Sequence, residues 1–104
     1  MKRHEEKRYT TGEFAQYFGI RKDTLFYYDR IGLFSPAAVG QNGYRYYTSS
    51  QISAMDTLLM LRQMNVPIRE IQEYLHAPSP ERLRKMTQAQ LEKTKQEIRK
   101  LQPL

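Results

Sequence analysis

Two short stretches of this 104-residue chain mix basic with aromatic side chains. The first is Arg21–Tyr28, Arg-Lys-Asp-Thr-Leu-Phe-Tyr-Tyr, and the second is Tyr44–Tyr47, Tyr-Arg-Tyr-Tyr. Guanidinium and ammonium groups pair with phosphate oxygens, and aromatic rings make apolar contacts with base edges. The two stretches therefore predict a surface that contacts nucleic acid.

Catalytic and metal chemistry has little support in the sequence. The chain has no cysteine, and His4 and His76 lie far apart without ligand-like spacing to carboxylates. Neither a Ser-His-Asp or Cys-His arrangement, nor a paired-carboxylate site, nor a phosphate loop is evident. We therefore expect no enzyme activity, no metal and no other cofactor.

Length and charge set the broad class. The chain is long enough for one core plus an appendage. No apolar run approaches the roughly 20 residues that cross a bilayer, and the N-terminus lacks a signal-peptide pattern. We expect a cytoplasmic protein with no membrane partner. The net charge of +6 points to nucleic acid, but residues 79–104 hold seven basic and three acidic residues, so most of the excess lies outside the two stretches.

A helix is expected directly before the first stretch. Thr10 and Glu13 have the spacing of a capping box, and Gly19 is a typical helix-ending residue. The apolar side of this helix consists of Phe14, Ala15, Tyr17 and Phe18.

The first stretch itself predicts a second helix, from Lys22 to about Ile31, with Gly32 as its C-cap. Leu25 and Tyr28 are expected to face the first helix. The residues that project from the other side are Lys22, Asp23, Phe26 and Tyr27. Two helices around a short turn are the arrangement that presents one helix to the DNA major groove.

The second stretch predicts a hairpin. Two very short strands flank Asn42-Gly43, a dipeptide that suits a turn with positive φ. Alternation places Arg45 and Tyr47 on one face, which should meet phosphate, and Tyr44 and Tyr46 on the other. Amphipathic spacing assigns Leu25, Tyr28 and Tyr44 to the core rather than to contact, and leaves Tyr27 open.

The remaining chain predicts three further helices. The third begins at a capping box, Thr48–Gln51, and its apolar residues cover more than one stripe, so we expect burial on two sides. A short fourth helix starts after Pro67. The fifth starts after Ser79-Pro80 and repeats Thr87, Leu91, Thr94, Ile98 and Leu101 at heptad spacing. Its most economical partner is its own copy, parallel or antiparallel.

These elements predict a mainly α fold with a small β-hairpin. Residues 1–8 would form a flexible basic arm, 9–76 a winged helix-turn-helix DNA-binding domain, 77–80 a linker and 81–102 a coiled-coil dimerisation helix. The predicted dimerisation residues are Leu91, Thr94, Ile98 and Leu101.

Three motifs in combination resemble the N-terminal DNA-binding and dimerisation region of MerR-family transcriptional regulators. They are Tyr-Thr-Thr-Gly-Glu-Phe-Ala at 9–15, Thr-Leu-Phe-Tyr-Tyr-Asp-Arg-Ile-Gly-Leu at 24–33 and Gly-Tyr-Arg-Tyr-Tyr-Thr at 43–48. The resemblance implies a homodimer joined by a long antiparallel coiled coil on a palindromic promoter operator. It also implies that the dimer bends and untwists the promoter spacer, so that it acts on RNA polymerase indirectly through the DNA.

The resemblance assigns DNA contacts to several positions. In the second helix these are Lys22, Thr24 and Tyr27, in the hairpin Arg45 and Tyr46, and near the end of the third helix Arg62. We add Thr11, Arg21 and Phe26 to the candidate DNA-binding residues.

Two positions depart from the family pattern. Phe26 stands where the family usually has arginine, so it cannot pair with a guanine edge or a phosphate but could contact a thymine methyl. Arg21 stands where a serine or threonine usually caps the reading helix, which would weaken the helix start by about 1 kcal/mol. Arg21 could regain binding energy at a phosphate.

The effector is expected to be organic or absent. The family's metal and redox sensors use cysteines, which this chain lacks. Members that sense organic compounds carry a separate C-terminal domain, and this chain ends just past the predicted coil. We expect a truncated form of such a regulator, whose organic effector would bind a C-terminal region absent from this chain, or else a regulator without an effector.

Two rival classes remain. An excisionase-like architectural protein would use the same winged fold to bend DNA for recombination, but it has no need for the helix at 81–102. A coiled-coil adaptor that does not bind DNA would leave Arg45 and the hairpin without a purpose.

Overall fold

The computed structural model describes residues 6–103 and divides the chain into two compact units, one up to residue 57 and one from residue 58. The chain is mainly helical with a small antiparallel sheet. His4 and most of the predicted basic arm lie outside the described residues. Each unit is described by itself.

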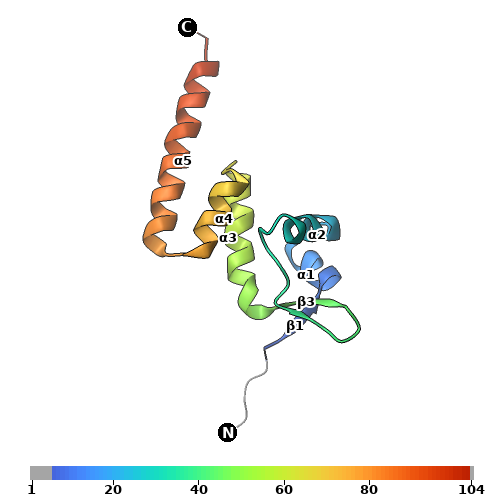
Figure 1. Ribbon diagram of the computed structural model, residues 1–104. Coiled ribbons are helices and arrows are strands. Elements are labelled where there is room, and N and C mark those ends of the chain that lie inside the picture. The colour runs from blue at the N-terminus through green and yellow to red at the C-terminus, as the bar shows by residue number, and fades with distance from the viewer. Residues whose placement is uncertain (1–5, 104) are drawn as a thin grey trace. The chain divides into compact units, whose positions relative to one another are not determined.

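The first unit combines two helices with a three-stranded sheet (Figure 1). The helices are α1 (Thr11–Phe18) and α2 (Lys22–Arg30). The strands are β1 (Arg8–Thr10), β2 (Ala38–Val39) and β3 (Arg45–Thr48), in the antiparallel order β1-β3-β2. This unit therefore contains the predicted helix pair and hairpin.

The turn between the helices is built as expected. The Thr10 hydroxyl accepts a hydrogen bond from the Glu13 backbone N–H, and the Glu13 carboxylate accepts one from the Thr10 backbone N–H, which confirms the capping box. Gly19 ends α1 in the left-handed conformation, with φ of 67°. Its N–H bonds the Gln16 carbonyl, and the N–H of Ile20 bonds the Ala15 carbonyl.

Replacing two glycines of this region with alanine should change the free energy of unfolding in opposite directions. Gly19→Ala is expected to lower the free energy of unfolding by about 1 kcal/mol, because its φ is positive although no atom lies within 4 Å of an added Cβ. Gly12→Ala is expected to raise it by up to about 1 kcal/mol, since its Cβ would meet Lys22 Cδ at an ordinary 3.5 Å. Urea unfolding of both variants measures this difference, and equal shifts would contradict it.

The core of the first unit is a stack of aromatic rings. The ring centres of Phe14 and Tyr47 are 4.6 Å apart, and the rings are nearly parallel. Phe34 also stacks against Tyr47, with 6.0 Å between the ring centres. Leu25 and Tyr28 of α2 are buried, as predicted. Burial raises the pKa of the Tyr47 phenol, which therefore stays neutral.

Strand β1 differs from the sequence-based expectation. Arg8 was assigned to a flexible arm, but it pairs with Thr48 in the sheet. Just before it, the Glu6 carboxylate accepts hydrogen bonds from the Ser50 backbone N–H and the Ser49 hydroxyl. Hydrogen bonding, chiefly with Ser50, lowers the pKa of Glu6. Backbone pairing needs no hydrophobic pattern, so the polar composition of this segment carried no signal for it.

The hairpin tip also differs in detail. In the described chain Asn65 is the sole non-glycine residue with positive φ, so Asn42 does not adopt the conformation predicted for it, whereas Gly43 does, with φ of 81°. The Asn42 side chain instead accepts a hydrogen bond from the Tyr44 N–H. Tyr44 was assigned to the core, yet 65% of it is exposed. The ring lines an open groove at the hairpin tip, so the core does not cover it.

The second unit contains the remaining helical segments. After a 3₁₀ turn, η1 (Ser49–Gln51), α3 (Ile52–Gln63) crosses from the first unit into the second. It is followed by α4 (Ile68–His76) and α5 (Pro80–Leu101). The buried apolar residues of this unit are Leu58, Leu61, Val66, Ile71 and Tyr74.

Polar groups cap the start of helix α5 and anchor its middle. The Ser79 hydroxyl caps it by accepting a hydrogen bond from the Arg82 N–H, and Pro80 is its first residue, as predicted. Farther along, the buried Gln90 side chain donates to the Met64 carbonyl at 3.0 Å. The heptad positions are less covered, since Leu91, Ile98 and Leu101 are 48%, 52% and 84% exposed.

Candidate nucleic-acid interface

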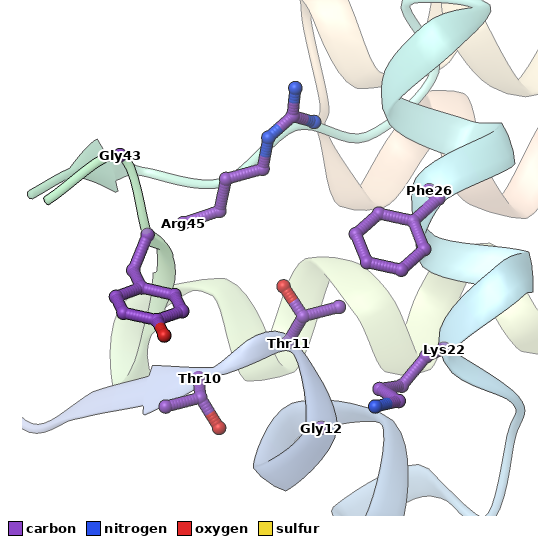
Figure 2. Close-up of a pocket in the computed structure, with 8 residues that line it drawn as sticks. Thr10, Thr11, Gly12, Lys22, Phe26, Gly43 and Arg45 are labelled. Carbon is purple, nitrogen blue, oxygen red and sulfur yellow. The ribbon is translucent and has the colours of Figure 1, made fainter.

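Three elements of the first unit converge on one groove of about 410 Å³ (Figure 2). They are the start of α1, the outer face of α2 and the tip of the β2–β3 hairpin. The lining residues are Thr10, Thr11, Gly12, Lys22, Phe26, Gly43, Tyr44 and Arg45. The groove is thus open, concave and flanked by two cations, Lys22 and Arg45.

The floor of the groove is the first turn of α1. The capping box fixes this turn, and the hydrogen bonds with Thr10 lower the pKa of the Glu13 carboxyl, which keeps it ionised. Gly12 leaves room for the Lys22 chain to pass close to the α1 backbone. Figure 2 shows Thr11 at this level, between Phe26 and the hairpin.

The α2 wall of the groove presents the outward face of that helix. Phe26 is 45% exposed and points into the groove (Figure 2), whereas Tyr27, the next residue, is 42% exposed and does not belong to the lining. The Arg30 guanidinium lies 5.5 Å from the centre of the Tyr27 ring. Arg21 occupies the N-cap position of α2 and makes no capping hydrogen bond, as its side-chain chemistry predicts.

The hairpin wall carries an ion pair. Arg45 Nη1 donates to the Asp29 carboxylate of α2, which ties the hairpin to the helix. Arg45 keeps 45% of its side chain exposed, whereas Asp29 keeps 19%. A guanidinium has five N–H donors, so this arrangement leaves donors available for a phosphate. Tyr47, placed on the same face by alternation, is instead buried in the core.

The predicted site residues do not all gather in one place. Those that line the groove are Thr11, Lys22, Phe26 and Arg45, and those that lie outside its lining are Arg21, Thr24, Tyr27 and Tyr46. Arg21 is exposed and pairs with Asp23 at 3.3 Å. Arg62 belongs to the second unit and donates to the Val66 carbonyl at 3.1 Å.

Sequence reasoning missed part of the groove. Tyr44 and Gly43 were read as a core ring and a turn residue, and Thr10 and Gly12 as helix-start residues only. The Asn-Gly turn was the signal for the first pair, because a hairpin tip lies beyond the core. At the start of α1 the sequence indicated Thr11 alone, and it carried no signal that Thr10 and Gly12 would lie beside it in the floor.

Two features of the described residues bear on other kinds of function. Within residues 6–103, no group of three or more histidine, cysteine, aspartate or glutamate side chains is placed to hold a metal ion. Across the same residues, no helix is both long and apolar enough to span a membrane.

Comparison with known proteins identifies the family. The model of the MerR HTH family regulatory proteins matches residues 9–78, which include both helices, the hairpin and α4. The chain belongs to the MerR family.

Full-length MerR-family relatives are much longer than this chain. The multidrug-efflux transporter 2 regulator of Bacillus subtilis is 34% identical over 107 residues, which cover 100% of this chain and 39% of that protein. Transcriptional regulator BrlR of Pseudomonas aeruginosa is 40% identical over 93 residues, which cover 86% of this chain and 34% of BrlR. The chain thus spans about two fifths or less of these relatives.

Solved structures of MerR-family proteins share the fold. MtaN, the N-terminus of the B. subtilis multidrug transporter activator, has a TM-score of 0.73 and 27% identity, covering 89% of this chain and 90% of MtaN. HiNmlR, described as a MerR family regulator lacking the sensor domain and bound to promoter DNA, has a TM-score of 0.69 and 23% identity, covering 91% of this chain and 79% of HiNmlR. The winged helix-turn-helix expected from the sequence is therefore confirmed.

Proposed function

We propose that this MerR-family chain is a sequence-specific DNA-binding transcription regulator that binds a palindromic promoter operator as a homodimer. The observation that carries the proposal is the groove, where the face of α2, the start of α1 and the hairpin tip meet between Lys22 and Arg45. A helix of this kind reads base edges in the major groove while a hairpin beside it follows the backbone.

The contacts fall into two classes. Arg21, Lys22 and Arg45 would bind phosphates, and such contacts position the protein without reading sequence. Thr24 and Tyr27 of α2 would face the major groove and its phosphates, and Tyr46 would belong with Arg45 to the hairpin wing. Thr11, at the start of α1, would add a further contact. Phe26 is the outlying case, because its side chain has no donor or acceptor.

The homodimer would form through α5. Leu91, Ile98 and Leu101 are exposed along one side of this helix, and Thr94 lies between them in the heptad. Exposed apolar side chains at heptad spacing are typical of a coiled coil. The two-fold axis of such a dimer would match the two halves of a palindromic operator.

The regulatory step would be a change in DNA shape. A dimer that bends and untwists a long promoter spacer would bring both promoter elements within reach of RNA polymerase, without touching the polymerase itself. The effector of such a regulator would be an organic compound.

Selection of bound duplexes from a random library at moderate salt tests the proposal. An enriched inverted repeat, with half-sites one or two helical turns apart, would support a two-fold dimeric regulator. Direct repeats or single sites would favour the excisionase-like architectural protein instead. A library without enrichment would contradict sequence-specific binding.

Arg45→Ala is expected to weaken binding to all duplexes by a similar factor and to lower the salt dependence, d log K/d log[salt], by about one unit. The reason is the loss of one phosphate contact. Equilibrium binding between low and moderate salt measures the slope, and Arg45→Lys, which keeps the charge, is the control. A sequence-selective loss at unchanged slope would contradict the phosphate role.

A further inference from the structure

We propose that Phe26 reads a thymine: its ring occupies the groove so that the C5-methyl group of one thymine per operator half-site packs against it. This inference rests on the proposed DNA binding and names the base that the site selects. It makes Phe26 a specificity-determining residue.

A single apolar side chain between two cations on the outer face of α2 carries the inference. Lys22, Phe26 and Arg30 stand at four-residue intervals on α2, so they lie on one face of the helix, and all three are exposed. The two outer residues are cations suited to phosphates. The middle residue, which faces the groove, offers only carbon atoms.

The neighbours of Phe26 preserve this apolar character. The Lys22 methylene chain lies over Gly12, whose added Cβ would be 3.5 Å from Lys22 Cδ. The Arg45 guanidinium is paired with the Asp29 carboxylate of α2, so part of its charge is already neutralised on the side of the groove that carries Phe26. Figure 2 shows the Phe26 ring and Thr11 on facing sides of the groove, with no charged group between them.

The chemistry of base edges selects one base. In the major groove, guanine presents two acceptors, cytosine a donor, and adenine one of each, while thymine presents a methyl group beside its acceptor. A donor or acceptor pressed against Phe26 would lose its hydrogen bond to water without a replacement. A methyl group would lose nothing and would bury apolar surface.

Removing that methyl group alone tests the inference. In the tightest-binding duplex from the library selection, each thymine of one half-site is replaced in turn with deoxyuridine, which differs only by the methyl group. For the unaltered protein, one such replacement is expected to weaken binding about four-fold, the value of one buried methyl group. For Phe26→Ala, the same replacement is expected to have no effect.

Two controls make the result specific. Tyr27→Ala alters a neighbouring aromatic of similar exposure and is expected to keep the four-fold difference, whatever its effect on affinity for either duplex. Phe26→Leu keeps an apolar surface and is expected to retain most of the difference. Folding of each variant is checked by circular dichroism, and the comparison between two duplexes cancels a common loss of affinity.

The outcomes separate this inference from the proposed function. If no thymine replacement weakens binding, or if Phe26→Ala shows the same loss as the unaltered protein, Phe26 does not read a methyl group although the protein still binds its operator. If the protein binds no duplex in preference to random DNA, both the proposed function and this inference are overturned.

Discussion

Ile98→Asp combined with Leu101→Asp is expected to convert a dimer into a monomer and to lower operator affinity by about 100-fold or more. Both side chains are exposed in the single chain, 52% and 84%, and would be buried in a coiled coil. Burying unpaired carboxylates there is prohibitive. Loss of the dimer removes the second, linked half-site contact, and such linkage is worth two to four orders of magnitude in affinity. Analytical ultracentrifugation and operator titration measure the two effects.

A matched control lies on the opposite side of the same helix. Ala89→Asp with Gln96→Asp introduces the same charge at two exposed positions that are seven residues apart. This pair should leave both the dimer and the operator affinity close to those of the parent chain. A parent chain that sediments as a monomer would show that α5 does not dimerise.

Phe14→Ala is expected to lower the free energy of unfolding by about 3–5 kcal/mol, the usual cost of deleting a buried phenyl ring. Phe14 is fully buried. The centre of its ring lies 5.0 Å from that of Phe18, 6.2 Å from that of Phe34 and 4.6 Å from that of Tyr47. Neighbours on several sides limit how far the cavity can collapse. Because small domains are stable by only about 5–15 kcal/mol, a large share of stability would be lost.

Tyr17→Ala is the matched control for Phe14→Ala. It removes an aromatic ring from the same helix, but one that is 58% exposed. Its effect on the free energy of unfolding should stay within about 1 kcal/mol. Thermal and urea unfolding compare the two variants, and similar losses would show that the ring stack is not the centre of this unit's stability.

The parts of the fold with a local chemical signature were predictable. A helix start needs particular residue types at fixed spacing, so Thr10 with Glu13 located one helix start and Ser79 followed by Pro80 located another. The buried side of α2 followed from the spacing of Leu25 and Tyr28. Each of these features depends on residues within one or two helical turns.

The parts that depend on distant partners were not predictable. Strand β1 exists because its backbone pairs with β3, some 38 residues later in the chain, and backbone groups are the same in every residue. The Arg45–Asp29 pair joins residues 16 apart whose meeting depends on the hairpin's angle. For the groove, the sequence indicated the two walls and Thr11, and only the three-dimensional arrangement added Thr10 and Gly12 to the floor.

The ion pair between Arg45 and Asp29 also affects the rate at which a ligand binds and the lifetime of the complex. A free arginine side chain samples many rotamers, and immobilising it costs about 2 kcal/mol of entropy. Because Asp29 already restrains the guanidinium, part of that ordering takes place during folding rather than on encounter with a ligand. The hairpin is thus preorganised, and weakening the pair should slow productive docking as well as shorten the lifetime of the complex.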